Sequence, residues 1–281
     1  MNRFAMLLCA GLAAGAAGFG AVDAALAQGM GRSAAGTGGL GDTLNHPEGW
    51  RFSVGIGPGI LPTYAGSKEY RFLPAVRATA EYEGYSASLF GLGARADLFA
   101  PDQIEIGPIL NYQFGRDGNE IAGLPGYEDA FYLGLYAAVE FKQVVGSRDT
   151  LRLEGTFEQN ISDTGDGYRY GLSVGYGMPL SRSLLANLTL GAEFNDAQLM
   201  QREYGVTAAG AASSGLAVHD PGDGVEGVYA TLFTGYRLTP QWGLFAVGSA
   251  KRLVGGAGDS PIVKQGSANQ FIGGFGITYT F

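Results

Sequence analysis

The feature that most constrains the fold of this chain is a two-residue period that begins near Trp50 and continues to the last residue. Over residues 70–82 the even positions are apolar or aromatic, whereas the odd positions include Arg71, Arg77 and Glu81. Such alternation is typical of β-strands that have one apolar and one polar face. The segments that show it are about twice as long as the ~5–6 residues of an average globular strand. We therefore expect an all-β protein built from long strands.

Strand length distinguishes a membrane barrel from a soluble sandwich. A strand that crosses the hydrocarbon core needs ~9–11 residues at a tilt of about 45°, and only a closed barrel satisfies every strand N–H and C=O group inside lipid. Single-chain bacterial barrels have an even number of strands. We therefore expect residues 50–281 to form a transmembrane antiparallel β-barrel of about 12 strands, of the outer-membrane type.

Eleven segments show the period clearly, so a further strand is needed to make the number even. The twelfth strand is expected near residues 197–206, the alternative being that one of the eleven segments is not a strand. With both chain ends in the periplasm, residues 239–241 form a short periplasmic turn and residues 254–268 an external loop. The eleven segments lie near residues 50–60, 70–83, 85–98, 103–115, 129–142, 150–161, 167–179, 184–195, 225–238, 241–253 and 269–281.

The composition agrees with a barrel and excludes other classes of protein. The chain has 48 Gly, 15 Tyr and 16 Phe among 281 residues, which also fits a disordered or a secreted β-protein, but the regular alternation argues against disorder. Beyond the N-terminal segment there is no apolar run of the ~18 residues that a transmembrane helix needs. The net charge is −8 and Lys and Arg form no basic run, so nucleic-acid binding is not expected.

The N-terminal segment, residues 1–27, is predicted to be a signal peptide. An apolar stretch ends in Ala25 and Ala27, which form an A-x-A site, so cleavage is expected after Ala27. A buried N-terminal helix is the alternative, but its glycines would weaken it. Residues 28–49 are rich in Gly and are expected to form a flexible tail. Cys9 would leave with the signal peptide, so the mature chain is expected to have no thiol.

The polar face of the strands is expected to point into the barrel, because a charge at mid-depth on the lipid face would cost ~2–4 kcal/mol. The mixed signs of these charges suggest ion pairs across the interior. Simple filling of the lumen is the favoured interpretation, and a selective pore is the alternative. The candidate lumen-facing charges are Arg77, Glu81, Glu105, Glu140, Lys142, Arg152, Glu154, Glu158 and Glu193.

Aromatic residues near strand ends suit the girdles that mark the two membrane interfaces, although ordinary strand packing explains any single one equally well. The last strand ends in Phe281, with Tyr279 and Gly276 shortly before it. This pattern resembles the C-terminal signal that the barrel assembly machinery reads. The candidate girdle residues are Tyr64, Tyr70, Tyr112, Tyr168, Trp242 and Tyr279.

No motif typical of an enzyme stands out in the sequence. His219 and Asp220 lie near Ser213 and Ser214, but no nucleophile motif surrounds either serine. The other histidine, His46, is far away in the sequence, so no transition-metal site is expected.

Two further candidate ligand sites are also not supported by the sequence. Asp220, Asp223 and Glu226 do not match a calcium-binding loop. The glycines of residues 54–59 precede no helix, so they do not form a nucleotide site. We expect no cofactor, no metal and no catalytic activity.

Four stretches in a fixed order carry a resemblance to a known family. They read VGIGPGILPTYAGSKEYRFLP at 54–74, IGPILNYQFGRD at 106–117, YGVTAAGAASSGLAVHDPGDGVEGV at 204–228, and YRLTPQWGLFAVGSAKRLVGGAGDSPIVKQGSANQFIGGFGITYTF at 236–281. With these motifs nearly the whole mature chain resembles the MipA/OmpV family of outer-membrane proteins, which is named for an MltA-interacting protein. The loop at residues 118–129 departs from the family because it is shorter and less acidic.

The resemblance implies a scaffold protein in the outer membrane of a Gram-negative bacterium. A lytic transglycosylase and a murein polymerase are the partners that it implies, besides membrane lipid and the barrel assembly machinery. Other family members are described as porin-like or as immunogenic surface proteins, so a small-solute channel and a surface adhesin or antigen remain alternatives. A lipid or ester hydrolase is the least expected function.

Overall fold

The computed structural model describes residues 49–99, 103–162 and 167–281. The predicted signal peptide, its cleavage residues Ala25 and Ala27, and nearly all of the predicted tail lie outside the described residues. Within the described part, no helix is both long and apolar enough to cross a membrane.

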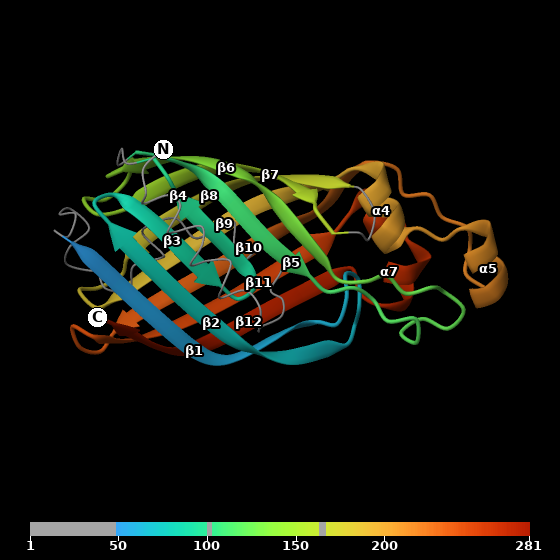
Figure 1. The fold of residues 1–281 in the computed structure, drawn as a ribbon, viewed down its shortest axis with the longest axis horizontal. Coiled ribbons are helices and arrows are strands. Elements are labelled where there is room, and N and C mark those ends of the chain that lie inside the picture. The colour runs from blue at the N-terminus through green and yellow to red at the C-terminus, as the bar shows by residue number, and fades with distance from the viewer. Residues whose placement is uncertain (1–48, 100–102, 163–166) are drawn as a thin grey trace.

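Twelve strands close into one antiparallel barrel (Figure 1). Each strand pairs with its neighbours in sequence, and β1 pairs with β12 to close the barrel. The expected fold class is therefore confirmed. The strands are β1 (Trp50–Pro62), β2 (Tyr70–Tyr82), β3 (Tyr85–Phe90), β4 (Gly93–Asp97), β5 (Ile104–Gln113), β6 (Ala130–Lys142), β7 (Thr150–Asn160), β8 (Tyr168–Pro179), β9 (Leu184–Asn195), β10 (Gly224–Arg237), β11 (Trp242–Leu253) and β12 (Asn269–Thr280).

The expected single strand at residues 85–98 is wrong, because this segment forms the two short strands β3 and β4. Phe90 pairs with Gly93 across a two-residue turn. Gly91 in that turn has a φ of 55°, a left-handed conformation that glycine adopts without steric cost. This hairpin supplies the twelfth strand, and it is the shortest part of the barrel wall.

The strand expected at residues 197–206 is also wrong, because this segment forms helix α4 (Ala197–Tyr204). The Asp196 side chain caps the helix by accepting a hydrogen bond from the Leu199 N–H group. The residues that α4 buries follow a helical spacing rather than a period of two. They are Leu199, Met200, Glu203 and Tyr204.

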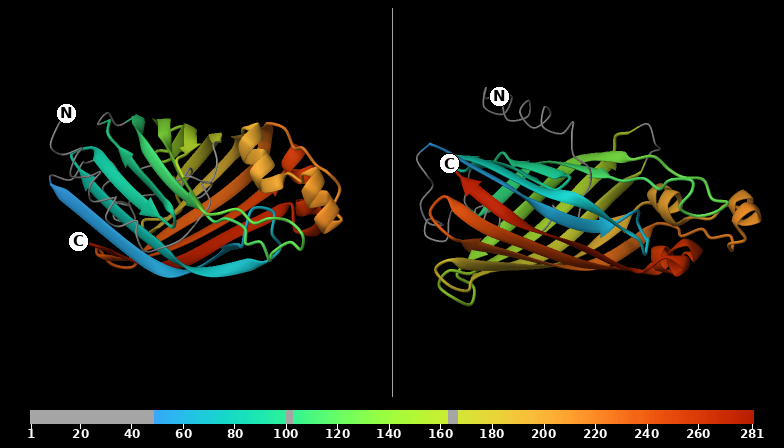
Figure 2. Two further views of the ribbon diagram at one scale, coloured as in Figure 1. Left: turned by 45° about the vertical axis from the view of Figure 1, so that its right-hand side comes forward. Right: turned by 90° about the horizontal axis from the view of Figure 1, so that it is seen from below.

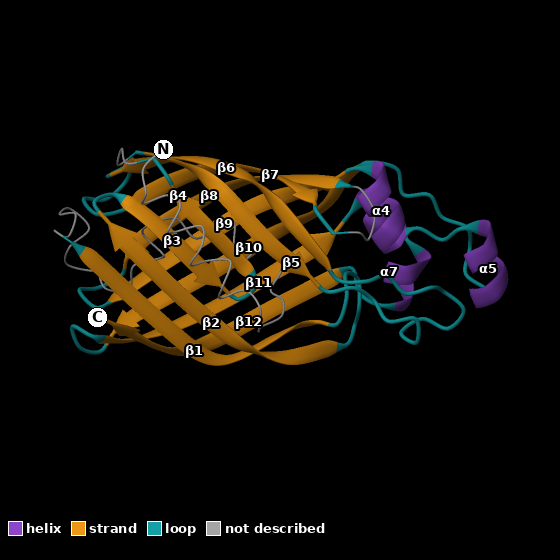
Figure 3. Ribbon diagram, viewed as in Figure 1, coloured by secondary structure: helices purple, strands orange, loops and turns teal. Residues whose placement is uncertain are grey.

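The two ends of the barrel differ in their connections (Figure 3). Short turns at residues 83–84, 143–149, 180–183 and 238–241 lie at the end that also holds the C-terminus, and by the general rule for bacterial barrels this end is periplasmic. Both views in Figure 2 show the helices at the opposite, external end. We call the following segments together the loop cap: residues 114–129, α4, α5 (Ala208–Ser214), α6 (Gly255–Asp259) and α7 (Pro261–Gln265).

The outer surface of the barrel is apolar, and aromatic pairs lie near both of its ends, such as Tyr112 with Phe131 toward the external end. Trp50 packs on Tyr82 and Trp242 packs on Tyr279 near the periplasmic end. Tyr64 does not join a girdle, because it is buried in the loop cap beside Ile121 and Ile262. Apolar residues exposed on the strands include Val54, Ile56, Leu133, Leu135, Leu153, Phe157, Leu172, Leu190, Leu232, Phe275 and Ile277.

Candidate functional site

The interior of the barrel holds a network of ion pairs on the side formed by β4–β8. Arg152 lies at its centre, with Nη1 2.6 Å from Glu105 Oε1 and Nη2 2.6 Å from Glu154 Oε2. Arg95 Nη2 lies 2.5 Å from the same oxygen of Glu154. The network therefore joins β4 and β5, which are neighbours in the sheet, with β7, which is a neighbour of neither.

A second part of the charged side is formed by residues of β5, β6, β7 and β8. Arg169 Nη2 lies 3.0 Å from Glu158 Oε2, which also accepts a hydrogen bond from Asn111 Nδ2 at 2.6 Å. The guanidinium group of Arg169 stacks over the Tyr132 ring at 4.1 Å. The side chains of these interior pairs are at most 7% exposed. Each charge is therefore compensated by protein groups rather than by water.

The opposite side of the interior holds the main apolar cluster, together with buried polar residues such as Arg77 and the hydrogen-bonded pair Thr231 and Ser249. Phe245 of β11 points inward over β12 and β1, where a Cβ atom on Gly276 would lie only 2.6 Å from the Phe245 Cε1 atom. The glycine therefore provides the space that the ring occupies. The buried apolar cluster on this side consists of Leu61, Ala75, Phe90, Leu92, Leu185, Phe233, Phe245, Val247 and Ile272.

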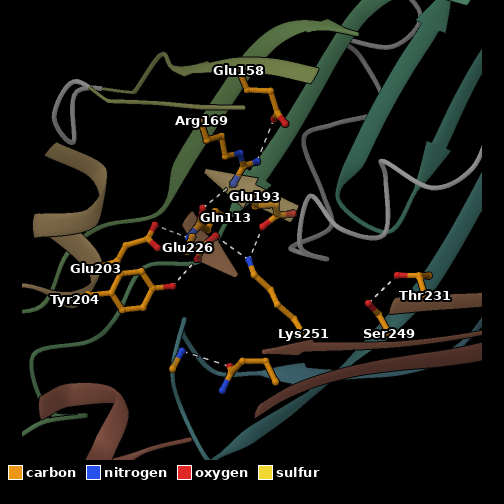
Figure 4. Close-up of polar contacts among 12 residues, drawn as sticks. Gln113, Glu158, Arg169, Glu193, Glu203, Tyr204, Glu226, Thr231, Ser249 and Lys251 are labelled. Carbon is orange, nitrogen blue, oxygen red and sulfur yellow. Dashed lines mark hydrogen bonds and ion pairs between the residues drawn. The ribbon is translucent and has the colours of Figure 1, made fainter. Parts of the chain in front are cut away.

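A third group of charges lies at the external mouth, beneath α4 (Figure 4). Lys251 Nζ lies 2.8 Å from Glu226 Oε2 and is also paired with Glu193. Glu226 Oε1 accepts a hydrogen bond from the Tyr204 hydroxyl group at 2.5 Å. One lysine thus bridges two carboxylates that come from β9 and β10.

Glu203 of α4 brings another carboxylate to this group. Its Oε1 atom accepts a hydrogen bond from Gln113 Nε2 at 2.7 Å. Among the described residues its Oε2 atom, which is buried, has no hydrogen-bond partner. Burial, and then the negative charge of Glu226, raise the pKa of Glu203 to about 7.

The loop cap packs on the barrel through its own apolar contacts. Met200 and Tyr204 of α4 pack with Leu253 and with Val263 of α7. The Ser260 hydroxyl group donates a hydrogen bond to the Tyr204 carbonyl oxygen at 2.7 Å. Helix α4 therefore connects the charged mouth of the barrel with the rest of the cap.

The structure places the predicted lumen-facing charges at three different positions. Glu81 is partly exposed and lies 3.7 Å from Arg51 near the periplasmic end. Lys142, the last residue of β6, lies on the same strand face as the buried Glu140 but is exposed at the periplasmic end. The remaining predicted charges are buried, namely Arg77, Glu105, Glu140, Arg152, Glu154, Glu158 and Glu193.

Several charged residues of the site were not among the predicted ones. Arg95, Arg169 and Lys251 alternate with outward residues in their strands, so the same two-residue period could have identified them. Glu203 lies on a helix in a segment that was predicted to be a strand, so the period gave no useful signal.

The residues considered for catalysis do not come together. The His219 Nε2 atom is hydrogen-bonded to the Gly256 carbonyl oxygen at 2.7 Å, while the Ser214 hydroxyl group donates to the Gly210 carbonyl oxygen. Glu226 is part of the Lys251 cluster. Within the described residues, no group of three or more His, Cys, Asp or Glu side chains is arranged to hold a metal ion.

The C-terminal residues take part in both the inner and the outer packing. Tyr279 contacts Phe281 edge to face, with ring centroids 4.9 Å apart. The Phe281 N–H group donates a hydrogen bond to the Phe52 carbonyl oxygen at 2.9 Å. Gly276 lies beneath Phe245, so its small size has a structural reason that is separate from any assembly signal.

A closed barrel with an apolar outer belt and charges buried inside defines an outer-membrane β-barrel protein. The sequence profile of the family described as MltA-interacting protein MipA matches residues 54–281. The chain therefore belongs to this family. No curated protein matches the chain significantly.

Solved structures with a similar fold are distant in sequence. The NanC porin is 7% identical and aligns over 80% of this chain and 98% of the porin, with a TM-score of 0.45. The translocator domain of the autotransporter NalP from Neisseria meningitidis is 14% identical over 86% of this chain and 92% of its own, with a TM-score of 0.45. The toluene transporter TodX of Pseudomonas putida is 11% identical over 83% and 89%, with a TM-score of 0.36.

Proposed function

We propose that this protein is a non-catalytic outer-membrane barrel that docks proteins of the murein machinery, and that it does not conduct solutes. The observation that carries this proposal is the filled interior. In a water-filled pore the charged side chains of the lining are hydrated. Here the paired interior side chains are at most 7% exposed, and an apolar cluster fills the other side.

The surfaces that remain for a partner are the two ends of the barrel. At the periplasmic end, the Asp149 carboxylate accepts hydrogen bonds from the N–H groups of Val144, Val145 and Gly146. A hydrogen bond from the Tyr176 hydroxyl group, together with these N–H groups, holds the pKa of Asp149 below its usual value. The turn is therefore fixed in one conformation before any partner binds.

This fixed turn presents an apolar side chain on the periplasmic side. Val145 is 83% exposed at its tip. A surface that is already ordered loses little conformational entropy on binding. The family is named for an interaction with MltA, and murein lies in the periplasm, so a lytic transglycosylase that meets this turn is the partner we propose.

The proposal can be tested with two matched variants in a pull-down. Val145→Asp changes the periplasmic turn, and Val218→Asp changes an exposed valine on the external side, which is 63% exposed. We expect the wild type and Val218→Asp to retain a lytic transglycosylase, and Val145→Asp to lose at least tenfold in binding. Retention no greater than that of an unrelated barrel would refute the docking role. If only Val218→Asp lost binding of the transglycosylase, the docking surface would lie on the external side.

A further inference from the structure

We propose that Glu203 is a proton-binding residue, and that its protonated side chain holds α4 and the loop cap on the mouth of the barrel. This role does not depend on the proposed docking of murein enzymes. It rests on the position of one buried carboxyl group and on the groups around it.

Several elements of the structure shield the Glu203 side chain from solvent. The residue is 1% exposed, and Gln113 of β5 provides its one side-chain hydrogen bond among the described residues. The charged and titratable groups around it are Arg116 and Tyr127 of the loop after β5, Tyr132 of β6, Arg169 of β8, Glu193 of β9, Arg202 and Tyr204 of α4, Glu226 of β10 and Lys251 of β11.

Each cation in this surrounding is hydrogen-bonded to a group other than the Glu203 carboxylate. Within the described chain, the Glu203 carboxylate itself therefore has no ion-pair partner. Arg116 does reach Glu203, but through its backbone carbonyl oxygen, at 3.4 Å. The contacts of the cations are Lys251 to Glu193 and Glu226, Arg169 to Glu158, Arg202 to the Glu128 carbonyl oxygen, and Arg116 to the Pro125 carbonyl oxygen.

An ionised Glu203 would add a third carboxylate charge to a mouth where Lys251 already serves two, and the nearby Arg169, Arg202 and Lys251 are bonded to other groups. A buried charge without a partner is strongly unfavourable, whereas a neutral carboxyl group needs only hydrogen bonds. The pKa of about 7 follows from this burial and from Glu226. The proton is therefore bound in mildly acidic medium and is released in mildly alkaline medium.

Release of the proton acts on the cap because Glu203 lies between residues that fasten α4. Tyr204, the next residue, is hydrogen-bonded to Glu226 and accepts a hydrogen bond from Ser260 at the start of α7. Repulsion between the ionised Glu203 and Glu226 opposes this packing. We infer that α4 and α7 loosen together as the pH rises, while the barrel wall below them is unchanged.

Hydrogen exchange of the full mature chain in lipid nanodiscs tests this directly. Exchange of residues 197–204 and 261–265 is compared at pH 6 and pH 8, after correction for the intrinsic rate. We expect these amides to lose at least fivefold in protection at pH 8 in the wild type. Glu203→Gln should keep its protection at pH 8. Glu69→Gln, a change at an exposed glutamate of the same end, should behave as the wild type.

Two results would overturn the proposal: equal protection of the wild type at both pH values, or an undiminished pH effect in Glu203→Gln. Should Glu203→Gln fail to fold, infrared spectroscopy of the wild type decides. A protonated carboxyl band present at pH 6 and lost at pH 8 supports the proposal. Absence of that band at pH 6 contradicts it.

Discussion

The two sides of the barrel interior are both filled, but by opposite means. On the side of β4–β8, arginine and glutamate side chains pair across strands that are not all neighbours. On the side of β1–β3 and β9–β12, an apolar cluster packs over glycines, and buried polar residues such as Arg77 lie beside it. We call these the charged side and the apolar side.

The difference shows what each side requires from the sequence. On the charged side every side chain depends on a named partner, because a buried charge left alone is costly. In the apolar cluster of the other side the cost of a change depends on volume, because its packing has no polar partner to lose. Substitutions should therefore behave differently on the two sides, and the following predictions test that contrast.

The largest effect is expected from removal of Arg152. Arg152→Met would leave the buried carboxylates of Glu105 and Glu154 with fewer partners, and we expect the free energy of unfolding to fall by about 3–5 kcal/mol. The matched change is Arg51→Met, at a partly exposed pair, which should cost only about 0–1 kcal/mol. Urea unfolding in lipid vesicles measures both values. Equal losses would show that the interior charges are not compensated as described.

A slightly smaller effect is expected on the apolar side. Phe245→Ala should cost about 3 kcal/mol, because it leaves a cavity above Gly276. Phe275→Ala removes the same ring from the exposed outer face and should cost less. The same urea experiment distinguishes them. If Phe275→Ala were the more damaging of the two, the inner cluster would not be a packed core.

The pH dependence of stability should come in part from Glu203. Its pKa is raised from 4.5 to about 7 in the folded protein, so the folded state keeps a proton that the unfolded state releases. This contribution is fully present below about pH 4.5, falls as the pH rises, and is lost above about pH 7. Between pH 5 and pH 8 we expect the free energy of unfolding to fall by about 1–3 kcal/mol less in Glu203→Gln than in the wild type. Parallel profiles for wild type and variant would refute the assignment.

The smallest effect is expected at the turn that joins the two sides. Gly91, between Phe90 and the strand of Arg95, has a φ of 55°, so Gly91→Ala should cost about 1 kcal/mol. Gly248→Ala is the control, because a Cβ atom there meets no atom within 4 Å and the backbone is not left-handed. The temperature at which the heat-modifiable gel band shifts would be measured for both variants and for the wild type. A loss at Gly248 as large as at Gly91 would remove the conformational explanation.

The sequence predicted the barrel and the inward direction of many charges, because both follow from a period of two. Arg152 and Glu154 share a face simply because they are two residues apart. Their partner Glu105 could not be predicted, since it belongs to β5 and the contact depends on how far the strands are staggered around the barrel.

The apolar side was harder to predict for a related reason. In β11, Phe245 and Val247 point inward while Leu244 and Ala246 point outward, so the run is apolar on both faces and its period is hidden. The Gly91 turn was missed because residues 85–98 were interpreted as one alternating run, and α4 was missed because its segment was chosen to make the number of strands even. Glu203 could therefore be placed only once the helix was known.

The central claim is that the interior is filled and its charges are compensated, and planar-bilayer recording of the wild-type barrel tests it most directly. The account predicts a silent bilayer at both pH 6 and pH 8, because loosening of the cap leaves the ion pairs below it in place. Discrete, stable conductance steps whose size changes in Glu158→Gln would contradict it, since they would show that ions pass the charged side of the interior.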